Sequence, residues 1–177
     1  MVWLTGLPGA GKSTVAYACE KALMASGHLS YVLDGDNLRH GLSSDLGFEA
    51  GDRAENVRRA AEAAAILADA GLITFAALVS PSRAERGKAR QRIGAERFIE
   101  VHVDAPRDEC ERRDPKGLYA RARRGEIAGF TGISAPYEAP EAPEIHLGPG
   151  VVPLAEAVKH VLEVLRGRGH LTRGVSS

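Results

Sequence analysis

The sequence has little cysteine, no net charge and no long apolar run. Its two cysteines, Cys19 and Cys110, lie far apart and fit no metal-binding spacing, which indicates reduced thiols in a cytoplasmic protein. Lys plus Arg and Asp plus Glu both count 23, so no net field favours nucleic acid or an anionic membrane as a partner. No run approaches the ~18 apolar residues of a membrane-spanning helix, and no signal-peptide pattern opens the chain. At 177 residues and 44% hydrophobic content, the chain is long enough to build one sizeable core.

A glycine-rich loop near the start fits the phosphate-loop pattern GxxxxGK[ST]. An apolar run precedes this loop and a helix-forming run follows it, which is the strand–loop–helix setting that the pattern requires. The glycines let successive backbone N–H groups point at phosphate oxygens, and the helix N-terminus adds its positive end. Lys12 is expected to reach the β- and γ-phosphates and Ser13 to bind Mg²⁺. The residues expected to bind ATP are Gly6, Leu7, Pro8, Gly9, Ala10, Gly11, Lys12, Ser13 and Thr14.

Apolar runs of strand length alternate with helical patterns along the chain. Such alternation predicts an α/β fold, with a five-stranded parallel sheet and helices on both faces. The segment 114–143 is rich in Gly, Pro, Arg and Lys, and we expect it to form a mobile lid. We predict one domain over residues 1–167 and a flexible tail over 168–177. The expected strands are Val2–Thr5, Ser30–Leu33, Leu72–Val79, Phe98–Val103 and Glu144–Leu147, and the expected helices lie near 13–26, 53–70, 82–93, 106–113 and 153–166.

Polar residues follow the second expected strand, where the chain reads Asp34-Gly35-Asp36-Asn37. Ligands of such sheets bind outside the carboxyl ends of the strands, so Asp34 should stand near the γ-phosphate and the metal. There it could order a magnesium-bound water, or orient and help deprotonate an attacking hydroxyl. The alternative is a capped turn, since Asp-Gly and Asp-Asn are common turn dipeptides. Farther on, Arg53 and Asn56 are three residues apart on one helix face and could point at a single ligand.

A set of longer motifs, in the same order along the chain, resembles the adenylylsulfate (APS) kinases. The resemblance runs from Val2 to about Leu147 and implies a P-loop kinase fold. It also implies transfer of the ATP γ-phosphate to the 3′-hydroxyl of adenosine 5′-phosphosulfate, giving 3′-phosphoadenylyl sulfate in sulfate activation. A homodimer is usual in that family, and an ATP sulfurylase could be fused or associated. The motifs are DGDNLRHGL at 34–42, DLGF at 45–48, DRAENVRR at 52–59, DPKGLYARARRGEIAGFTGI at 114–133 and APYEAPEAPE at 135–144.

The phosphate-loop pattern assigns catalysis to Lys12 and Mg²⁺ to Ser13. Carried over by position, the resemblance adds Asp34, to catalysis and, through water, to Mg²⁺, and it adds Ser80 as a further catalytic candidate. Ser80 matches a family serine sometimes assigned as a phosphoserine intermediate. We favour direct in-line transfer, which makes Ser80 a hydrogen-bonding residue of the pocket. An aromatic residue usually follows Pro81 in the family, whereas this chain has Ser82. The residues implied to bind substrate are Asp36, Asn37, Arg39, Phe48, Arg53, Asn56, Lys116, Phe130 and Thr131, with Phe48 and Phe130 stacked against the adenine.

Several charged residues have more than one interpretation. Asp104 ends an apolar run like a metal-binding acid, but the following Ala105-Pro106 favours a helix cap. Arg112, Arg113 and Arg121 could meet the phosphates of either nucleotide. The histidines show no metal-binding spacing. His40 stands beside the acceptor motif without a partner carboxylate at fixed spacing. The others are scattered along the chain: His28, His102, His146, His160 and His170.

Two other functions compete with adenylylsulfate phosphorylation. One is a P-loop kinase for another small metabolite, such as shikimate or gluconate. Phe48 and Phe130 argue against it, because a polar acid or sugar does not require two aromatic faces. The other is a non-catalytic nucleotide-binding module, against which the intact Lys12, Ser13 and Asp34 argue.

Overall fold

A parallel five-stranded sheet forms the centre of the molecule in the computed structural model, which describes residues 1–150 and 152–171. The strand order is β2-β3-β1-β4-β5. The strand β1 lies in the middle, buried along its whole length, which explains its apolar sequence. This arrangement confirms the predicted α/β fold. The strands are β1 (Val2–Thr5), β2 (Ser30–Asp34), β3 (Ile73–Ala77), β4 (Ile99–Val103) and β5 (Ile145–Leu147).

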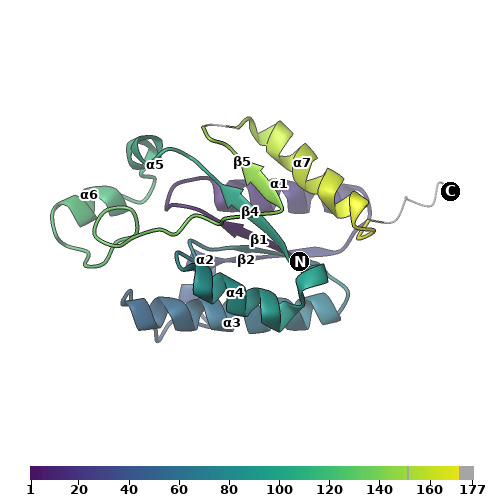
Figure 1. The fold of residues 1–177 in the computed structure, drawn as a ribbon, viewed down its shortest axis with the longest axis horizontal. Coiled ribbons are helices and arrows are strands. Elements are labelled where there is room, and N and C mark those ends of the chain that lie inside the picture. The colour runs from purple at the N-terminus through teal and green to yellow at the C-terminus, as the bar shows by residue number, and fades with distance from the viewer. Residues whose placement is uncertain (151, 172–177) are drawn as a thin grey trace.

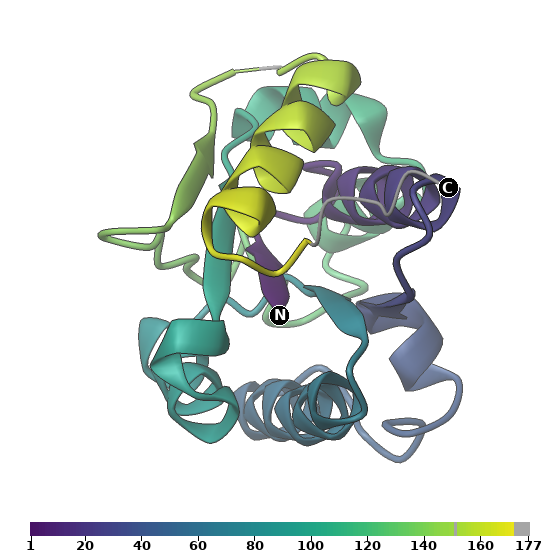
Figure 2. The ribbon, with the colours of Figure 1, turned by 90° about the vertical axis from the view of Figure 1, so that its right-hand side faces the viewer.

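Helices cover both faces of the sheet (Figure 1). Helices α1 (Lys12–Ala25) and α7 (Leu154–Gly167) lie on one face, and α3 (Ala50–Asp69) and α4 (Arg83–Ile93) lie on the other. Figure 2, turned by 90°, shows the strands between these two helical layers. Side chains alternate across β1 accordingly: Val2 and Leu4 join the core under α1 and α7, whereas Trp3 joins the core under α3 and α4.

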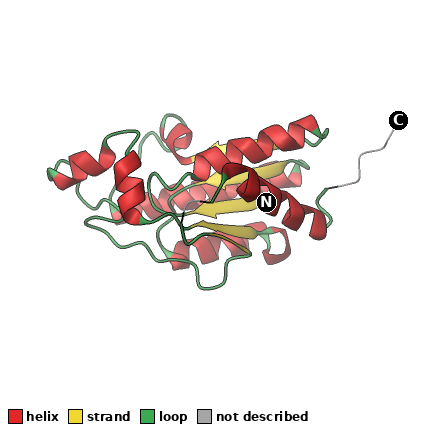
Figure 3. Ribbon diagram, turned by 90° about the horizontal axis from the view of Figure 1, so that it is seen from above, coloured by secondary structure: helices red, strands yellow, loops and turns green. Residues whose placement is uncertain are grey.

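The short helices gather at the carboxyl end of the strands. They are α2 (Gly35–Arg39), α5 (Arg107–Arg113) and α6 (Leu118–Arg123), and in Figure 1 α5 and α6 lie at the left end of the molecule. Loops connect them at that end (Figure 3). The sequence did not predict α6, which lies inside the expected lid. A single turn of 3₁₀ helix, η1 (Ala95–Arg97), precedes β4.

Two expectations about element ends are corrected by the structure. The third strand ends at Ala77 rather than at Val79, because the chain turns out of the sheet and Ser80 adopts a positive φ of 37°. Asp104 does not cap the following helix: α5 has Pro106 at its N-cap position, and no side chain of the described residues caps it. The Asp104 carboxylate instead contacts Nε2 of His146 at 2.8 Å.

The end of the described chain packs on the rest of the molecule. Arg168 donates a hydrogen bond to the carbonyl oxygen of Phe98 (3.1 Å), and Leu171 contacts the core under α7. The expected tail therefore begins with residues that make contacts, and its remainder, 172–177, lies outside the described residues. Within residues 1–150 and 152–171, no helix has the length and apolar character needed to cross a membrane.

Candidate active site

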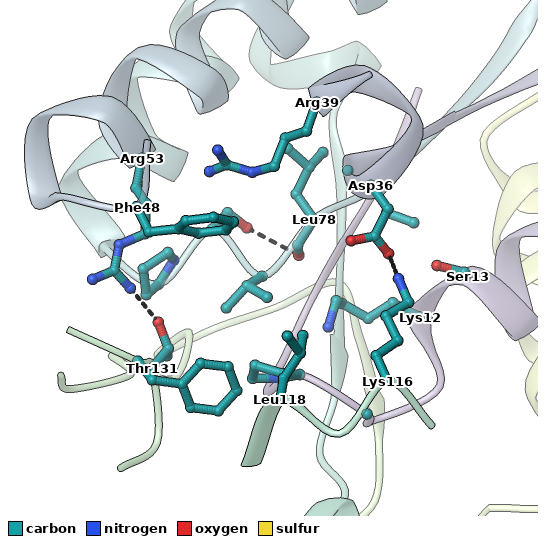
Figure 4. A pocket seen from close by; sticks show the side chains of 18 of the residues that line it. Lys12, Ser13, Asp36, Arg39, Phe48, Arg53, Leu78, Lys116, Leu118 and Thr131 are labelled. Carbon is teal, nitrogen blue, oxygen red and sulfur yellow. Dashed lines mark hydrogen bonds and ion pairs between the residues drawn. The ribbon is translucent and has the colours of Figure 1, made fainter. Parts of the chain in front are cut away.

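A cavity of about 830 Å³ opens at the carboxyl end of the sheet. The phosphate loop, α2, the start of α3, the loop after β3 and the lid segment all contribute to its walls, as Figure 4 shows for part of the lining. Each substrate-binding residue expected from the sequence lines this one cavity, and so do Asp34 and Ser80. Of the expected ATP-binding residues, Gly6, Leu7 and Ala10 do not line it, whereas the other members of the loop do.

The phosphate loop needs glycine where the chain passes close to its neighbours. Gly6 has a φ of 154°, and a Cβ atom there would lie 2.5 Å from the carbonyl oxygen of Val103. Gly9 has a φ of 77°, and its Cβ atom would lie 3.0 Å from the carbonyl oxygen of Cys110. A side chain at either position would therefore displace backbone.

Lys12 lies inside the curve of this loop. Its Nζ donates hydrogen bonds to the carbonyl oxygens of Gly6 (3.0 Å) and Leu7 (2.7 Å). Burial lowers the pKa of Lys12 to about 8, although the nearby charges of Asp36 and Asp34 favour its protonated form. The ammonium group is thus held at the position where phosphate oxygens would be met.

Ser13 and Asp34 form the oxygen-rich part of the site. The Ser13 hydroxyl donates a 2.5 Å hydrogen bond to Oδ2 of Asp34. The other carboxylate oxygen, Oδ1, accepts from the backbone N–H groups of Asp36 (2.9 Å) and Asn37 (3.4 Å) and so caps α2. The capped turn is therefore present on Oδ1, and Oδ2 faces Ser13. A hydroxyl and a carboxylate facing each other are ligands that suit Mg²⁺.

The acceptor side of the cavity carries cations and an aromatic ring. The guanidinium of Arg39 lies 4.4 Å from the centre of the Phe48 ring and donates to the carbonyl oxygen of Gly47 (2.7 Å). Phe48 remains 60% exposed, so the outer face of its ring is available. Asn56 is buried, and its Oδ1 has no hydrogen-bond partner within the described residues. A buried acceptor without a partner is costly unless a ligand supplies the donor.

Hydrogen bonds and an ion pair join the lid segment, 114–143, to residues across this cavity (Figure 4). Arg53 donates to Oγ1 of Thr131 and to the carbonyl oxygen of Gly129, both at 2.5 Å. Lys116 forms an ion pair with Asp36. Phe130 is buried and packs edge-on against Tyr119, with 5.0 Å between ring centres.

Tyr119 is a pocket residue that the sequence reasoning missed. Its hydroxyl donates to the carbonyl oxygen of Pro8 (3.0 Å), so it joins the lid to the phosphate loop. Its place in the KGLY stretch, where Lys116 and Leu118 line the same cavity, was the available signal.

Ser80 is held firmly in the wall of the cavity. It is buried, and its Oγ accepts a hydrogen bond from Nε1 of Trp3 (3.1 Å). Its carbonyl oxygen accepts from Arg86 (2.6 Å). These contacts fit a serine that shapes the pocket.

Arg112 and Arg113 of α5 and Arg121 of the lid are engaged with acidic side chains in this structure. Arg112 and Arg113 both pair with Glu109, and Arg121 pairs with Glu126. Only Arg121 of the three lines the cavity in the described part of the chain. Arg113 approaches the phosphate loop, with Nη1 at 3.5 Å from the carbonyl oxygen of Gly9.

The fold and the site define a class of protein. A glycine-rich loop between a central parallel strand and a helix, a lysine and a serine at that helix start, and a carboxylate at the end of the next strand make a P-loop kinase.

Comparison with known proteins gives the particular family. The family described as adenylylsulphate kinase matches residues 1–148, so the chain belongs to the adenylylsulphate kinase family. An adenylyl-sulfate kinase of Enterobacter sp. (strain 638) is 57% identical over 166 residues, which cover 94% of this chain and 82% of that protein. The bifunctional enzyme NodQ of Rhizobium sp. (strain N33) is 56% identical over 90% of this chain, which spans 25% of NodQ.

A solved structure agrees with this assignment. The Mycobacterium tuberculosis APS kinase CysC, in complex with AMPPNP and APS, superposes with a TM-score of 0.88 at 49% identity. The match covers 93% of this chain and 96% of that one. The resemblance found in the motifs is thereby confirmed.

Proposed function

We propose that this chain transfers the γ-phosphate of ATP to the 3′-hydroxyl of adenosine 5′-phosphosulfate, giving 3′-phosphoadenylyl sulfate. The observation that carries the proposal is that one cavity is lined both by the phosphate loop and by every residue expected to bind the acceptor. A relative of 49% identity and TM-score 0.88 binds AMPPNP and APS, the two kinds of ligand that this cavity would receive.

On the donor side, the chain would act by positioning and by charge. Lys12 would leave the carbonyl oxygens of Gly6 and Leu7 to neutralise charge on the transferring phosphoryl group. Ser13 and Asp34 would hold Mg²⁺, which supplies charge neutralisation across the phosphates when it is bound. Asp34 would also accept a hydrogen bond from the 3′-hydroxyl and orient it for in-line attack.

On the acceptor side, the exposed face of Phe48 and the ring of Phe130 would enclose the adenine. Arg39, Arg53 and Lys116 supply positive charge for the phosphosulfate, and all three line the cavity. The unpartnered Oδ1 of Asn56 would accept a hydrogen bond from the acceptor. Binding would release Arg53 and Lys116 from the lid contacts that they make in this structure.

An acceptor panel tests the proposal directly. The purified chain is incubated with γ-labelled ATP and Mg²⁺ and with adenylylsulfate, gluconate or shikimate, and the labelled products are separated. We expect label only in 3′-phosphoadenylyl sulfate. The Lys12→Ala variant should bind adenylylsulfate but transfer no label, because it lacks the cation that meets the transferring group. Phosphorylation of gluconate or shikimate alone would refute the assignment, and so would near-normal turnover by folded Lys12→Ala.

We further propose a homodimer in the cytoplasm, working alone or joined to an ATP sulfurylase. The family resemblance supports this assembly, and the longer bifunctional relative shows that sequences like this one occur inside larger chains. Light scattering of the chain in solution measures its mass; a monomeric mass at assay concentration would contradict the dimer.

A further inference from the structure

Two histidines and an aspartate meet at the sheet edge formed by β4 and β5. We propose that His102, Asp104 and His146 form a binding site for a single Zn²⁺ ion, separate from the nucleotide cavity. His102 and His146 are register partners in the parallel pairing of the two strands, and Asp104 comes directly after β4. The atoms that could bind a metal lie within 4.8 Å of one another.

The distances are close to those that one ion requires. Zn–N and Zn–O bonds of about 2.0–2.2 Å place the ligand atoms of a tetrahedral site roughly 3.3–3.6 Å apart. In the structure, Nε2 of His146 lies 2.8 Å from Oδ2 of Asp104, and Nε2 of His102 lies 4.0 Å from Oδ1. The two imidazole rings stack with 5.1 Å between centres and 4° between planes. Parallel rings cannot both direct a lone pair at one ion, so one of them must turn.

His146 is the ring that can turn, because its side chain is 46% exposed. The His102 ring and the backbone of Asp104 are held in place. His102 is buried and stacks on Tyr137 at 5.9 Å, and the Tyr137 hydroxyl lies 3.0 Å from Oγ1 of Thr5. The backbone N–H of Asp104 donates to the carbonyl oxygen of Leu147 (2.9 Å), which fixes the backbone of Asp104 beside β5.

The ligand set selects the kind of metal. Two imidazoles and one carboxylate suit Zn²⁺, Co²⁺ or Ni²⁺, whereas Mg²⁺ prefers oxygen ligands such as those of Ser13 and Asp34. Three protein ligands leave one tetrahedral position for water. Among the described residues that line the nucleotide cavity, none of the three ligands occurs, so the ion would not take part in phosphoryl transfer. It would tie β5, a strand of three residues at the sheet edge, to β4.

Calorimetric titration with ZnCl₂, in an excess of Mg²⁺ that occupies the oxygen-rich site, tests the proposal. We expect one Zn²⁺ per chain and a dissociation constant at least tenfold higher in His146→Gln, His102→Phe and Asp104→Asn. His160→Gln is the matched control, because His160 is an exposed histidine on α7 outside the cluster, and it should bind Zn²⁺ like the parent chain. The visible spectrum of the Co²⁺ form should show the intense bands of a four-coordinate site with imidazole ligands, and lose them in His146→Gln.

A thermal measurement separates the site from adventitious binding. Zn²⁺ that binds only the folded state raises the melting temperature of the parent chain, and this rise should vanish in His146→Gln. That variant changes an exposed side chain, so it tests the proposal even if His102→Phe fails to fold. Equal Zn²⁺ affinity in the parent chain and His146→Gln, or loss of binding in His160→Gln alone, would overturn the proposal. Absence of Zn²⁺ binding to the parent chain would also overturn it, and Asp104 and His146 would then form only a hydrogen-bonded pair.

Discussion

Asp34 divides its two carboxylate oxygens between structure and chemistry. Oδ1 caps α2 through the N–H groups of Asp36 and Asn37, and Oδ2 holds the Ser13 hydroxyl. An asparagine at this position would keep the capping oxygen, because Asn is as good an N-cap as Asp, but it would lose the negative charge that faces Ser13.

We therefore expect Asp34→Asn to lower turnover by a factor of roughly a hundred or more, the scale of losing a positioned base or metal-shell carboxylate. The melting temperature and the affinity for adenylylsulfate should change much less. Steady-state kinetics and a binding titration measure the two effects separately, with Asp45→Asn, an exposed surface carboxylate, as control. A loss mainly of adenylylsulfate affinity would make Asp34 a binding residue instead.

We expect ATP binding to be coupled to the protonation of Lys12. Its pKa is lowered to about 8 by burial, so in the ligand-free protein it loses its proton above that pH. The unfolded chain keeps the proton up to a pKa of 10.5, and the free energy of unfolding should therefore rise with pH between about 8 and 10.5. Phosphate charge favours the protonated amine, so we expect ATP binding above pH 8 to take up a proton.

At pH 9 we expect uptake of more than about half a proton per ATP bound, and much less at pH 7. Calorimetry in buffers of different ionisation enthalpy measures this number. Lys12→Arg should show no such uptake, since its guanidinium stays charged across this range. Equal uptake in Lys12→Arg would assign the proton to another group.

At the scale of elements, the two phenylalanines of the pocket stand on segments that differ in burial and in packing. Phe130 is buried and packs on Tyr119 of α6, which ties the lid to the phosphate loop. Phe48 is 60% exposed in the loop between α2 and α3, where it contacts Arg39. Phe130 can therefore both anchor the lid and face the ligand, whereas Phe48 can act only on the ligand.

This difference predicts separate outcomes for the two alanine variants. Both Phe48→Ala and Phe130→Ala should weaken adenylylsulfate binding by roughly tenfold or more, because base–aromatic stacking is worth ~1–3 kcal/mol. Only Phe130→Ala should also lower the free energy of unfolding, by about 3–5 kcal/mol for a buried phenylalanine. Ligand titration and urea denaturation give the two numbers. An equal loss of ATP and adenylylsulfate affinity in Phe130→Ala would show that Phe130 only anchors the lid and does not stack on the adenine.

For the whole molecule, Arg86 is a buried side chain that joins several separate segments. It is buried on α4, pairs with Glu100 of β4 at 2.7 Å, and donates to the carbonyl oxygens of Ser80 (2.6 Å) and Glu138 (2.7 Å). It thus holds together α4, the sheet, the cavity wall after β3 and the segment that returns from the lid. Removing Arg86 takes from Glu100 its nearest cation, leaving only the more distant Arg90 at 3.6 Å, and takes a charged donor from two carbonyl groups.

Arg86→Ala should accordingly lower the free energy of unfolding by about 3–5 kcal/mol, measured by urea denaturation. Arg83→Ala provides the matched control: Arg83 lies on the same helix, pairs with Glu141 and donates to the carbonyl oxygen of Ala139, but is half exposed. Its loss should cost no more than about 1 kcal/mol. A similar loss of unfolding free energy in both variants would show that Arg86 does not stabilise these segments more than Arg83 does.

The sequence by itself determined the features that depend on neighbours along the chain. The phosphate loop, the capped turn at Asp34 and the alternation of strands and helices follow from glycine freedom, capping and hydrophobic period, which act over a few residues. From these and the ordered motifs, the five strands, the kinase class and many, though not all, residues of the cavity could be predicted.

Only the tertiary structure decided which distant side chains meet. Lys116 pairs with Asp36, Arg53 holds Thr131, and Arg86 joins four segments, although no local pattern marks these pairs. Asp104 meets His146 instead of capping α5, because the register of β4 against β5 places His102 beside His146. Packing of the strands into one sheet sets that register. A contact between residues far apart in sequence can stabilise the protein only after the chain between them has folded, so the local sequence does not reveal it.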